Sequence, residues 1–145
     1  MIIGIDPGQS GAATAMTRNG GIIDIFTFKD ATAADIKEAL EEYKHMLDGP
    51  LMAYLENVHT MPKQGIASAG KFMRHFGMLE GILVALEIPY ELISPQKWQG
   101  HLNCRTKGDK NITKAKAQQL WPDREWTHAT SDSALIAEYG RQVTK

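Results

Sequence analysis

The chain is poor in cysteine, has no long apolar run and carries almost no net charge. Its single cysteine, Cys104, has no partner for an internal disulfide and no Cys-x-x-Cys spacing of a zinc site. No apolar run is long enough to cross a membrane, and the N-terminus lacks a signal-peptide pattern. We therefore expect a protein of the reducing cytoplasm, with no membrane partner.

The net charge of −1 gives no indication of a nucleic-acid partner, but the charges are unevenly distributed. Residues 1–60 carry nine acids and four bases, whereas residues 61–116 carry nine bases and four acids. Between Lys97 and Lys116 the one acid is Asp109. Such a local excess can meet phosphates, although a solvated helix face and its preceding loop explain it equally well, and charge alone favours the solvated face.

What the chain does have is the composition of one globular domain. Its 145 residues are 43% hydrophobic and 23% charged, which allows a sizeable core. The sequence shows no internal repeat, low-complexity tract or interdomain linker. We expect residues 1–145 to form a single domain.

The apolar pattern predicts five strands. Asn19-Gly20-Gly21 is a strong hairpin signal between two of them, and the nearly continuous apolar run at 51–55 is typical of a central strand. The predicted strands are 2–6, 12–17, 22–28, 51–55 and 90–93.

Helical spacing and helix-boundary residues predict the helices. Thr32 resembles an N-cap, and Gly49-Pro50 ends that first helix. A heptad-like stripe follows the loop at 60–67, whereas Ser94 begins a second, basic loop. The predicted helices are about 32–47, a long one through 72–86, 113–120 and 129–142. The order predicts an α/β fold with a mixed five-stranded sheet, its first three strands antiparallel, and helices on both faces.

Two strands each end in a carboxylate. Asp6 follows the apolar run Ile2 to Ile5, and Glu56 follows the central strand. A carboxylate there is costly to bury unless a base is paired with it or it holds a metal. In open α/β sheets, ligands collect beyond the carboxyl ends of the strands.

A third acid, Asp132, lies near the start of the last predicted helix. Three acids from distant segments could converge, and carboxylates held close together need a cation such as Mg²⁺, which prefers oxygen ligands. A pair of such ions can activate water and stabilise the leaving oxygen of a phosphodiester. Taken alone, Asp132 is better explained as a helix cap.

Four segments in this order, IIGIDPGQSGA, YLENVH, SPQKW and SDSALIAEYGR, resemble RuvC-type Holliday junction resolvases, most of all the compact phage and prophage members. The resemblance spans nearly the whole chain. It implies an RNase H-like fold, a homodimer, and cleavage of four-way DNA junctions with Mg²⁺ or Mn²⁺, two ions per active site. It also implies that Asp6, Glu56 and Asp132 are catalytic metal ligands.

The chain departs from this family at position 129. A second acid three or four residues before Asp132 is usual there, but Ala129 and His128 occupy these positions. An acid at 129 would share a helix face with Asp132 and complete a cage of four carboxylates. Either His128 replaces it as a metal ligand, or position 129 was an acid changed to alanine; we favour the second hypothesis. His59 could also lie near the metals, but a loop histidine bonded to the backbone is the more usual case.

The resemblance also points to DNA contacts from basic residues. Lys107 and Lys110 lie in a lysine-rich segment that contacts DNA near the scissile phosphate in this family, and which of the two matches stays open. We expect further phosphate contacts from Lys63, Lys71, Arg74, Lys97, Arg105 and Lys114.

Resolvases of this type use an aromatic side chain to disturb the junction centre, but the loop after the central strand contains none. Met61, Pro62 or Ile66 would have to act as the apolar wedge. Phe72 and Phe76 have helical spacing, which favours the core over base stacking.

Overall fold

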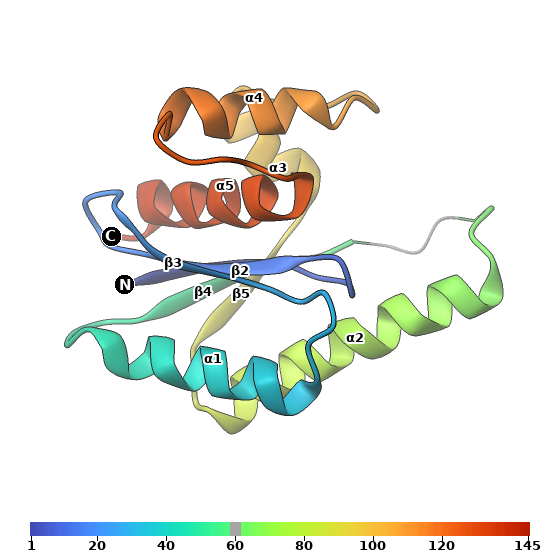
Figure 1. The fold of residues 1–145 in the computed structure, drawn as a ribbon, viewed down its shortest axis with the longest axis horizontal. Coiled ribbons are helices and arrows are strands. Elements are labelled where there is room, and N and C mark those ends of the chain that lie inside the picture. The colour runs from blue at the N-terminus through green and yellow to red at the C-terminus, as the bar shows by residue number, and fades with distance from the viewer. Residues whose placement is uncertain (59–61) are drawn as a thin grey trace.

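The computed structural model describes residues 1–58 and 62–145 of the chain. It contains a five-stranded sheet with helices on both faces (Figure 1). The elements in chain order are β1 Ile2–Asp6, β2 Ala12–Met16, β3 Ile22–Thr27, α1 Ala33–Met46, β4 Met52–Glu56, α2 Ile66–Ala85, β5 Tyr90–Ile93, α3 Pro95–His101, α4 Asn111–Leu120 and α5 His128–Val143.

The sheet is mixed, as predicted, and its strand order is β3-β2-β1-β4-β5. The first three strands pair antiparallel, while β1 pairs parallel with β4 and β4 with β5. The parallel strands β1, β4 and β5 therefore end at the same edge. No helix in the described part of the chain combines the length and apolar character that a membrane span needs.

Local sequence signals set several boundaries. Thr32 caps α1 in a full capping box, because its side chain accepts from the Asp35 N–H while the Asp35 carboxylate accepts from the Thr32 N–H. One expectation is wrong: the segment from Pro95 to His101 is helix α3, not a loop. Ser94 accepts from the backbone N–H of Lys97, and Pro95 stands at the first helical position, where a missing N–H does no harm.

The face of the sheet covered by α1 and α2 has an apolar core. Ile3 and Ile5 of β1 point into it and meet Leu40 of α1 with Leu79 and Leu83 of α2. These side chains are essentially inaccessible to water. The heptad-like stripe of α2 therefore packs on the sheet of its own chain.

The opposite face is covered by α5, with α3 and α4 beyond it (Figure 1). Ile2 of β1 and Trp98 of α3 belong to this second core. Gly4 allows the close approach of α5, because a Cβ at this position would collide with the backbone of Ser133 and Ala137. The last helix thus lies directly against the central strand.

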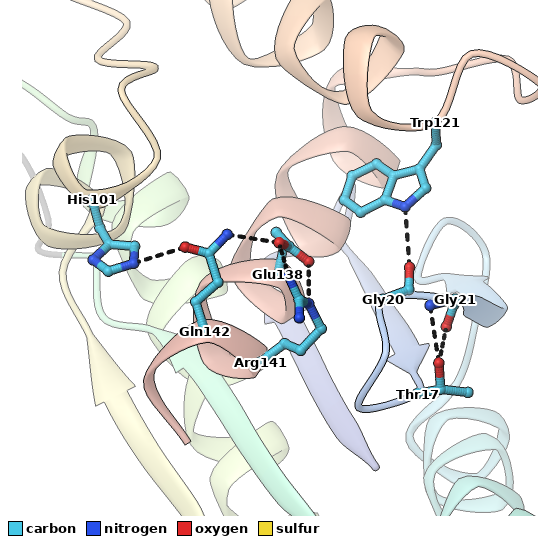
Figure 2. Close-up of polar contacts among 8 residues, drawn as sticks. All are labelled: Thr17, Gly20, Gly21, His101, Trp121, Glu138, Arg141 and Gln142. Carbon is cyan, nitrogen blue, oxygen red and sulfur yellow. Dashed lines mark hydrogen bonds and ion pairs between the residues drawn. The ribbon is translucent and has the colours of Figure 1, made fainter. Parts of the chain in front are cut away.

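A polar network fixes the C-terminal half of α5 (Figure 2). The Arg141 guanidinium donates two hydrogen bonds to the buried Glu138 carboxylate, at 2.8 and 2.6 Å, and the Gln142 amide donates a third at 2.7 Å. His101 Nε2 donates to Gln142 Oε1 at 3.0 Å, and Trp121 Nε1 donates to the carbonyl of Gly20 in the β2–β3 turn. His101 thus links α3 to α5, and Trp121, directly after α4, separately links the end of α4 to the β2–β3 hairpin.

Candidate active site

The carboxylates of Asp6 and Glu56 come from neighbouring strands and face the same way. Along β1 and β4, residues facing α1 and α2 alternate with residues facing α5, as the two-residue period of a strand requires. Ile2 and Tyr54 face α5, so the even-numbered Asp6 and Glu56 do too. Ile5 is paired with Leu55, which places both acids at the carboxyl end of their strands.

Asp132 comes to the same place from helix α5, and it is not a cap. Thr127 is the N-cap, since its hydroxyl accepts from the Thr130 N–H at 3.2 Å. Asp132 lies in the second turn, and its Oδ1 is buried without a hydrogen-bond partner in the described structure. The nearby Thr113 side chain, whose hydroxyl donates to the Lys110 carbonyl at 3.1 Å, opposes the rise in the pKa of Asp132. A buried carboxylate oxygen without a donor is an expensive feature that a bound cation would relieve.

The three acids line one pocket of about 620 Å³ at the carboxyl edge of the sheet. Its other walls are the turn Pro7 to Gly11, the first half of α2, α3 and the start of α5. The residues that line it are Asp6, Pro7, Gly8, Gln9, Ser10, Gly11, Glu56, Val58, Gln64, Ser68, Lys71, Phe72, Pro95, Gln99, Thr106, Lys110, His128, Ala129 and Asp132. The convergence predicted from sequence is therefore present in the geometry.

The carboxyl groups repel one another inside this pocket. Burial, followed by the charges of Glu56 and Asp132, raises the pKa of Asp6 well above its ordinary value. Burial raises the pKa of Glu56 to about 7, although the hydrogen bond from Trp98 acts to lower it. The pKa of Asp132 is raised by burial as well, while the nearby charge of Lys110 opposes the rise at all three acids. The site is thus short of positive charge.

The donor set fits a hard divalent cation. Carboxylate oxygens are the ligands that Mg²⁺ and Mn²⁺ prefer, and the partnerless Oδ1 of Asp132 is one of them. Among residues 1–58 and 62–145, however, no group of three or more His, Cys, Asp or Glu side chains is placed so that it could hold a metal ion as it stands. The three acids therefore share one pocket, but their oxygens are not gathered at a single point in this structure. Ala129 and the exposed His128 both line the pocket.

Trp98 supports Glu56 through a hydrogen bond that sequence reasoning missed. The indole Nε1 donates to Glu56 Oε2 at 2.6 Å, and the Trp98 side chain is fully buried. Glu56 and Trp98 are 42 residues apart, so no local pattern in the sequence could identify them as partners. The charge-assisted bond fixes the orientation of one site carboxylate.

His75 was also missed. Its Nδ1 accepts the backbone N–H of Gly8 at 3.2 Å, in the turn two residues after Asp6. The imidazole is nearly buried, and burial lowers its pKa, which favours the neutral ring that can accept this bond. The hydrogen bond joins α2 to the turn that shapes the pocket.

The basic residues divide into two groups. Lys110 and Lys71 line the pocket, so of the two lysines left open by the sequence Lys110 is the one beside the carboxylates. Lys107 is exposed in a turn, with a φ of 48°, and does not line the pocket. The other predicted DNA contacts are exposed and also lie outside it, namely Lys63, Arg74, Lys97, Arg105 and Lys114.

The wedge candidates are only partly placed. Met61, like His59, lies outside the described residues. Pro62 is exposed, and Ile66 is 93% exposed at the start of α2. Phe76 is in the core as expected, but the half-buried Phe72 lines the pocket instead.

Comparison with known proteins is informative at the level of structure. No protein-family model matches the chain, and no curated protein does. RuvC of Thermus thermophilus is similar in structure, with a TM-score of 0.61 and 14% identity over 95% of this chain and 91% of that chain. RuvC of T. thermophilus in complex with a Holliday junction substrate gives a TM-score of 0.64 with 14% identity, over 95% and 90% of the two chains.

A third similar structure is the yeast mitochondrial Holliday junction resolvase, with a TM-score of 0.50 and 20% identity over 97% of this chain and 77% of that chain. The chain has the RuvC-type, RNase H-like fold. The fold expected from the resemblance is thereby confirmed. Membership of the phage-encoded group stays a prediction.

Proposed function

We propose that the protein is a metal-dependent endonuclease that hydrolyses phosphodiesters in four-way or otherwise branched DNA. The observation that carries the proposal is that Asp6, Glu56 and Asp132 line one pocket, where a buried oxygen of Asp132 has no donor among residues 1–58 and 62–145. The RuvC-type fold supports the substrate class, since one similar structure is a complex with a Holliday junction substrate.

In this proposal, Asp6, Glu56 and Asp132 would hold Mg²⁺ or Mn²⁺, with two ions per active site. When bound, such ions lower the pKa of the attacking water and stabilise the leaving oxygen. Trp98 orients Glu56 through its indole N–H. Lys110, at the pocket wall, supplies positive charge to the phosphate that undergoes hydrolysis.

Cutting two opposing strands of a junction requires two active sites. A two-fold homodimer would present them symmetrically, and we propose this state together with a cytoplasmic location. Of the other predicted contacts, Lys97, Arg105 and Lys114 would bind the arms of the junction through their phosphates.

The proposal is tested with a labelled four-way junction and a linear duplex of the same sequence. Cleavage of the junction in Mg²⁺ or Mn²⁺, its absence with a chelator, and resistance of the linear duplex are the expected results, for the chain itself if His128 serves as a ligand and for Ala129→Asp if position 129 has lost an acid. Asp6→Asn and Glu56→Gln should abolish cleavage and spare junction binding. Cleavage retained by either variant would refute the metal-ligand assignment.

A second candidate function is a junction-binding protein without nuclease activity. The observation in its favour is that Ala129 lines the pocket three residues before Asp132, where an acid would complete the ligand set. If this account holds, the chain binds junctions without cutting them, and Ala129→Asp raises Mg²⁺-dependent cleavage by orders of magnitude. Ala129→Ser, which adds an oxygen but no charge, is the matched control. An unchanged rate in Ala129→Asp would refute the lost-acid hypothesis.

A further inference from the structure

A second cavity, of about 900 Å³, opens beside the active-site pocket. One wall is the connection from Phe28 to Ala33 between β3 and α1, and the other is helix α2. The lining residues of α2 are Lys71, Arg74, His75 and Met78, spaced as neighbours on a single helix face. The cavity is therefore a groove between one helix and one loop, and we call it the α2 groove.

The α2 groove borders the active-site pocket. Gln9, Ser10 and Lys71 line both spaces. The turn after Asp6 thus lies between two neighbouring cavities, and a DNA strand bound at the carboxylates would reach the α2 groove by passing over this turn.

The charge of the α2 groove is suited to a polyanion. Its exposed cations, Lys29, Lys71 and Arg74, come from both walls, and Asp30 is the acid among its lining residues. Because these cations are exposed, they surround the opening rather than the base. A small anion would need its donors gathered at one point, whereas an extended phosphodiester backbone suits cations spread along two walls.

The base of the α2 groove is formed by neutral groups. Phe28 is 2% exposed and His75 is 9% exposed, with ring centroids 5.4 Å apart. Since His75 Nδ1 accepts from the Gly8 N–H, the neutral ring carries its proton on Nε2. Nε2 is then a donor for a phosphate or sugar oxygen, and Ser10 adds a hydroxyl at the border with the active site.

We propose that the α2 groove binds the phosphodiester backbone of the DNA strand adjacent to the bond that is cut. Lys29 and Arg74 contact consecutive phosphates from opposite walls, and Lys71 spans the border with the catalytic pocket. This inference rests on the proposed function. It adds a phosphate-binding track formed by α2 and the β3–α1 connection, separate from the basic stretch between Lys97 and Lys116.

The first experiment measures binding of a fluorescent four-way junction without divalent metal, so that neither cleavage nor the state of position 129 matters. The test variant is Lys29→Glu with Arg74→Glu, which leaves the catalytic pocket intact. The matched control is Arg18→Glu with Lys145→Glu, which changes the net charge equally. Arg18 is exposed in the β2–β3 turn, and Lys145 is exposed at the C-terminus. Circular dichroism establishes that both are folded.

We expect the groove variant to lose at least about tenfold in junction affinity, and the control variant to lose little. In Lys29→Ala with Arg74→Ala, the slope of log affinity against log salt should become shallower by up to about 2, at roughly 0.9 per phosphate contact. Equal affinity loss in groove and control variants, or an unchanged salt slope, would overturn the inference while leaving the proposed function standing.

A second experiment locates the phosphates. Junctions carrying one neutral methylphosphonate linkage at each position beside the cleavage site are titrated with wild type and with Lys29→Ala, Arg74→Ala. One or two positions should weaken wild-type binding several-fold and have no effect on the variant. If no position discriminates between the two proteins, the α2 groove does not bind the phosphodiester backbone and the inference is refuted. If the wild-type protein binds neither the junction nor the duplex, the proposed function and this inference are both overturned.

Discussion

The two faces of the sheet bury different kinds of side chain. On the α1 and α2 face, apolar side chains such as Leu40 and Leu79 pack together, and the hydroxyl of the buried Tyr43 donates outward to the exposed Asp24. On the α5 face, polar pairs are buried among the apolar ones: the Thr14 and Ser133 hydroxyls are 2.7 Å apart, and Trp98 donates to Glu56. Both faces exclude water, but only the second carries the site carboxylates.

The difference follows from what each interaction controls. Apolar packing is non-directional and contributes stability in proportion to buried area, whereas a buried hydrogen bond also fixes orientation. The α1 and α2 face therefore stabilises the fold, and the α5 face sets the geometry of Asp6, Glu56 and Asp132. Substitutions on the α1 and α2 face should therefore lower stability without changing metal affinity, whereas substitutions around the site carboxylates should lower metal affinity.

The largest effect on stability is expected from Leu79→Ala in α2. Leu79 is fully buried, so the cavity should lower the free energy of unfolding by about 2–5 kcal/mol. Mn²⁺ affinity of the folded variant should be unchanged. Val84→Ala on the exposed side of α2 is the matched control and should stay within about 0.5 kcal/mol of wild type. Denaturant unfolding and calorimetry measure both quantities, and a weakened Mn²⁺ site in Leu79→Ala would contradict the separation of the faces.

The opposite behaviour is expected from Trp98→Phe on the α5 face. The variant loses the indole donor to Glu56, and a lost partner of a metal ligand typically weakens metal binding by about 10–100-fold. Trp126→Phe is the control, because that indole is equally buried but donates to the carbonyl of Trp121. It should lose stability and keep its Mn²⁺ affinity. Equal Mn²⁺ affinities in the two variants would show that the Trp98 hydrogen bond does not support metal binding.

Metal-free stability should fall as pH rises from about 4.5 to about 7, the interval between the ordinary pKa of Glu56 and its value in the fold. In this interval the folded state holds a proton that the unfolded state has lost, so raising the pH favours unfolding. The contribution is on the order of 1–2 kcal/mol after allowance for relaxation. Glu56→Gln should lack it, and saturating Mg²⁺ should cancel it. The measurement is the difference between wild type and variant in unfolding free energy across pH, and a flat difference would contradict the raised pKa.

The smallest effect is expected at His75, where α2 contacts the turn after Asp6. His75→Leu leaves the Gly8 N–H without its acceptor, which should destabilise the fold by about 1 kcal/mol and weaken Mn²⁺ binding a few-fold. His75→Asn places an oxygen where Nδ1 stood and should restore most of the Mn²⁺ affinity. Identical Mn²⁺ titrations for the two variants would show that the hydrogen bond does not position the turn.

Much of the fold could be predicted because its signals are local. The hairpin at Asn19-Gly20-Gly21, the cap at Thr32 and the apolar run before Glu56 each depend on a few neighbouring residues. The place of Asp6 and Glu56 at one edge also follows from strand period and parallel pairing. These features needed no knowledge of how distant segments meet.

Features that depend on distant segments, or on very short ones, could not be predicted from the sequence. Asp132, taken alone, resembles a helix cap, but α5 begins five residues earlier at its true cap, Thr127. The helix at Pro95–His101 is too short for an apolar period to distinguish it from a loop. The donor from Trp98 to Glu56 joins segments that only the finished fold brings together.

The central claim is that Asp6, Glu56 and Asp132 together hold divalent metal. The most direct measurement is the anomalous difference density of a crystal of this protein grown with Mn²⁺. We predict density in the pocket between the three acids, within about 2.0–2.3 Å of their carboxylate oxygens and including Oδ1 of Asp132. A pocket with no density at saturating Mn²⁺, and with that oxygen still lacking a partner, would contradict the account.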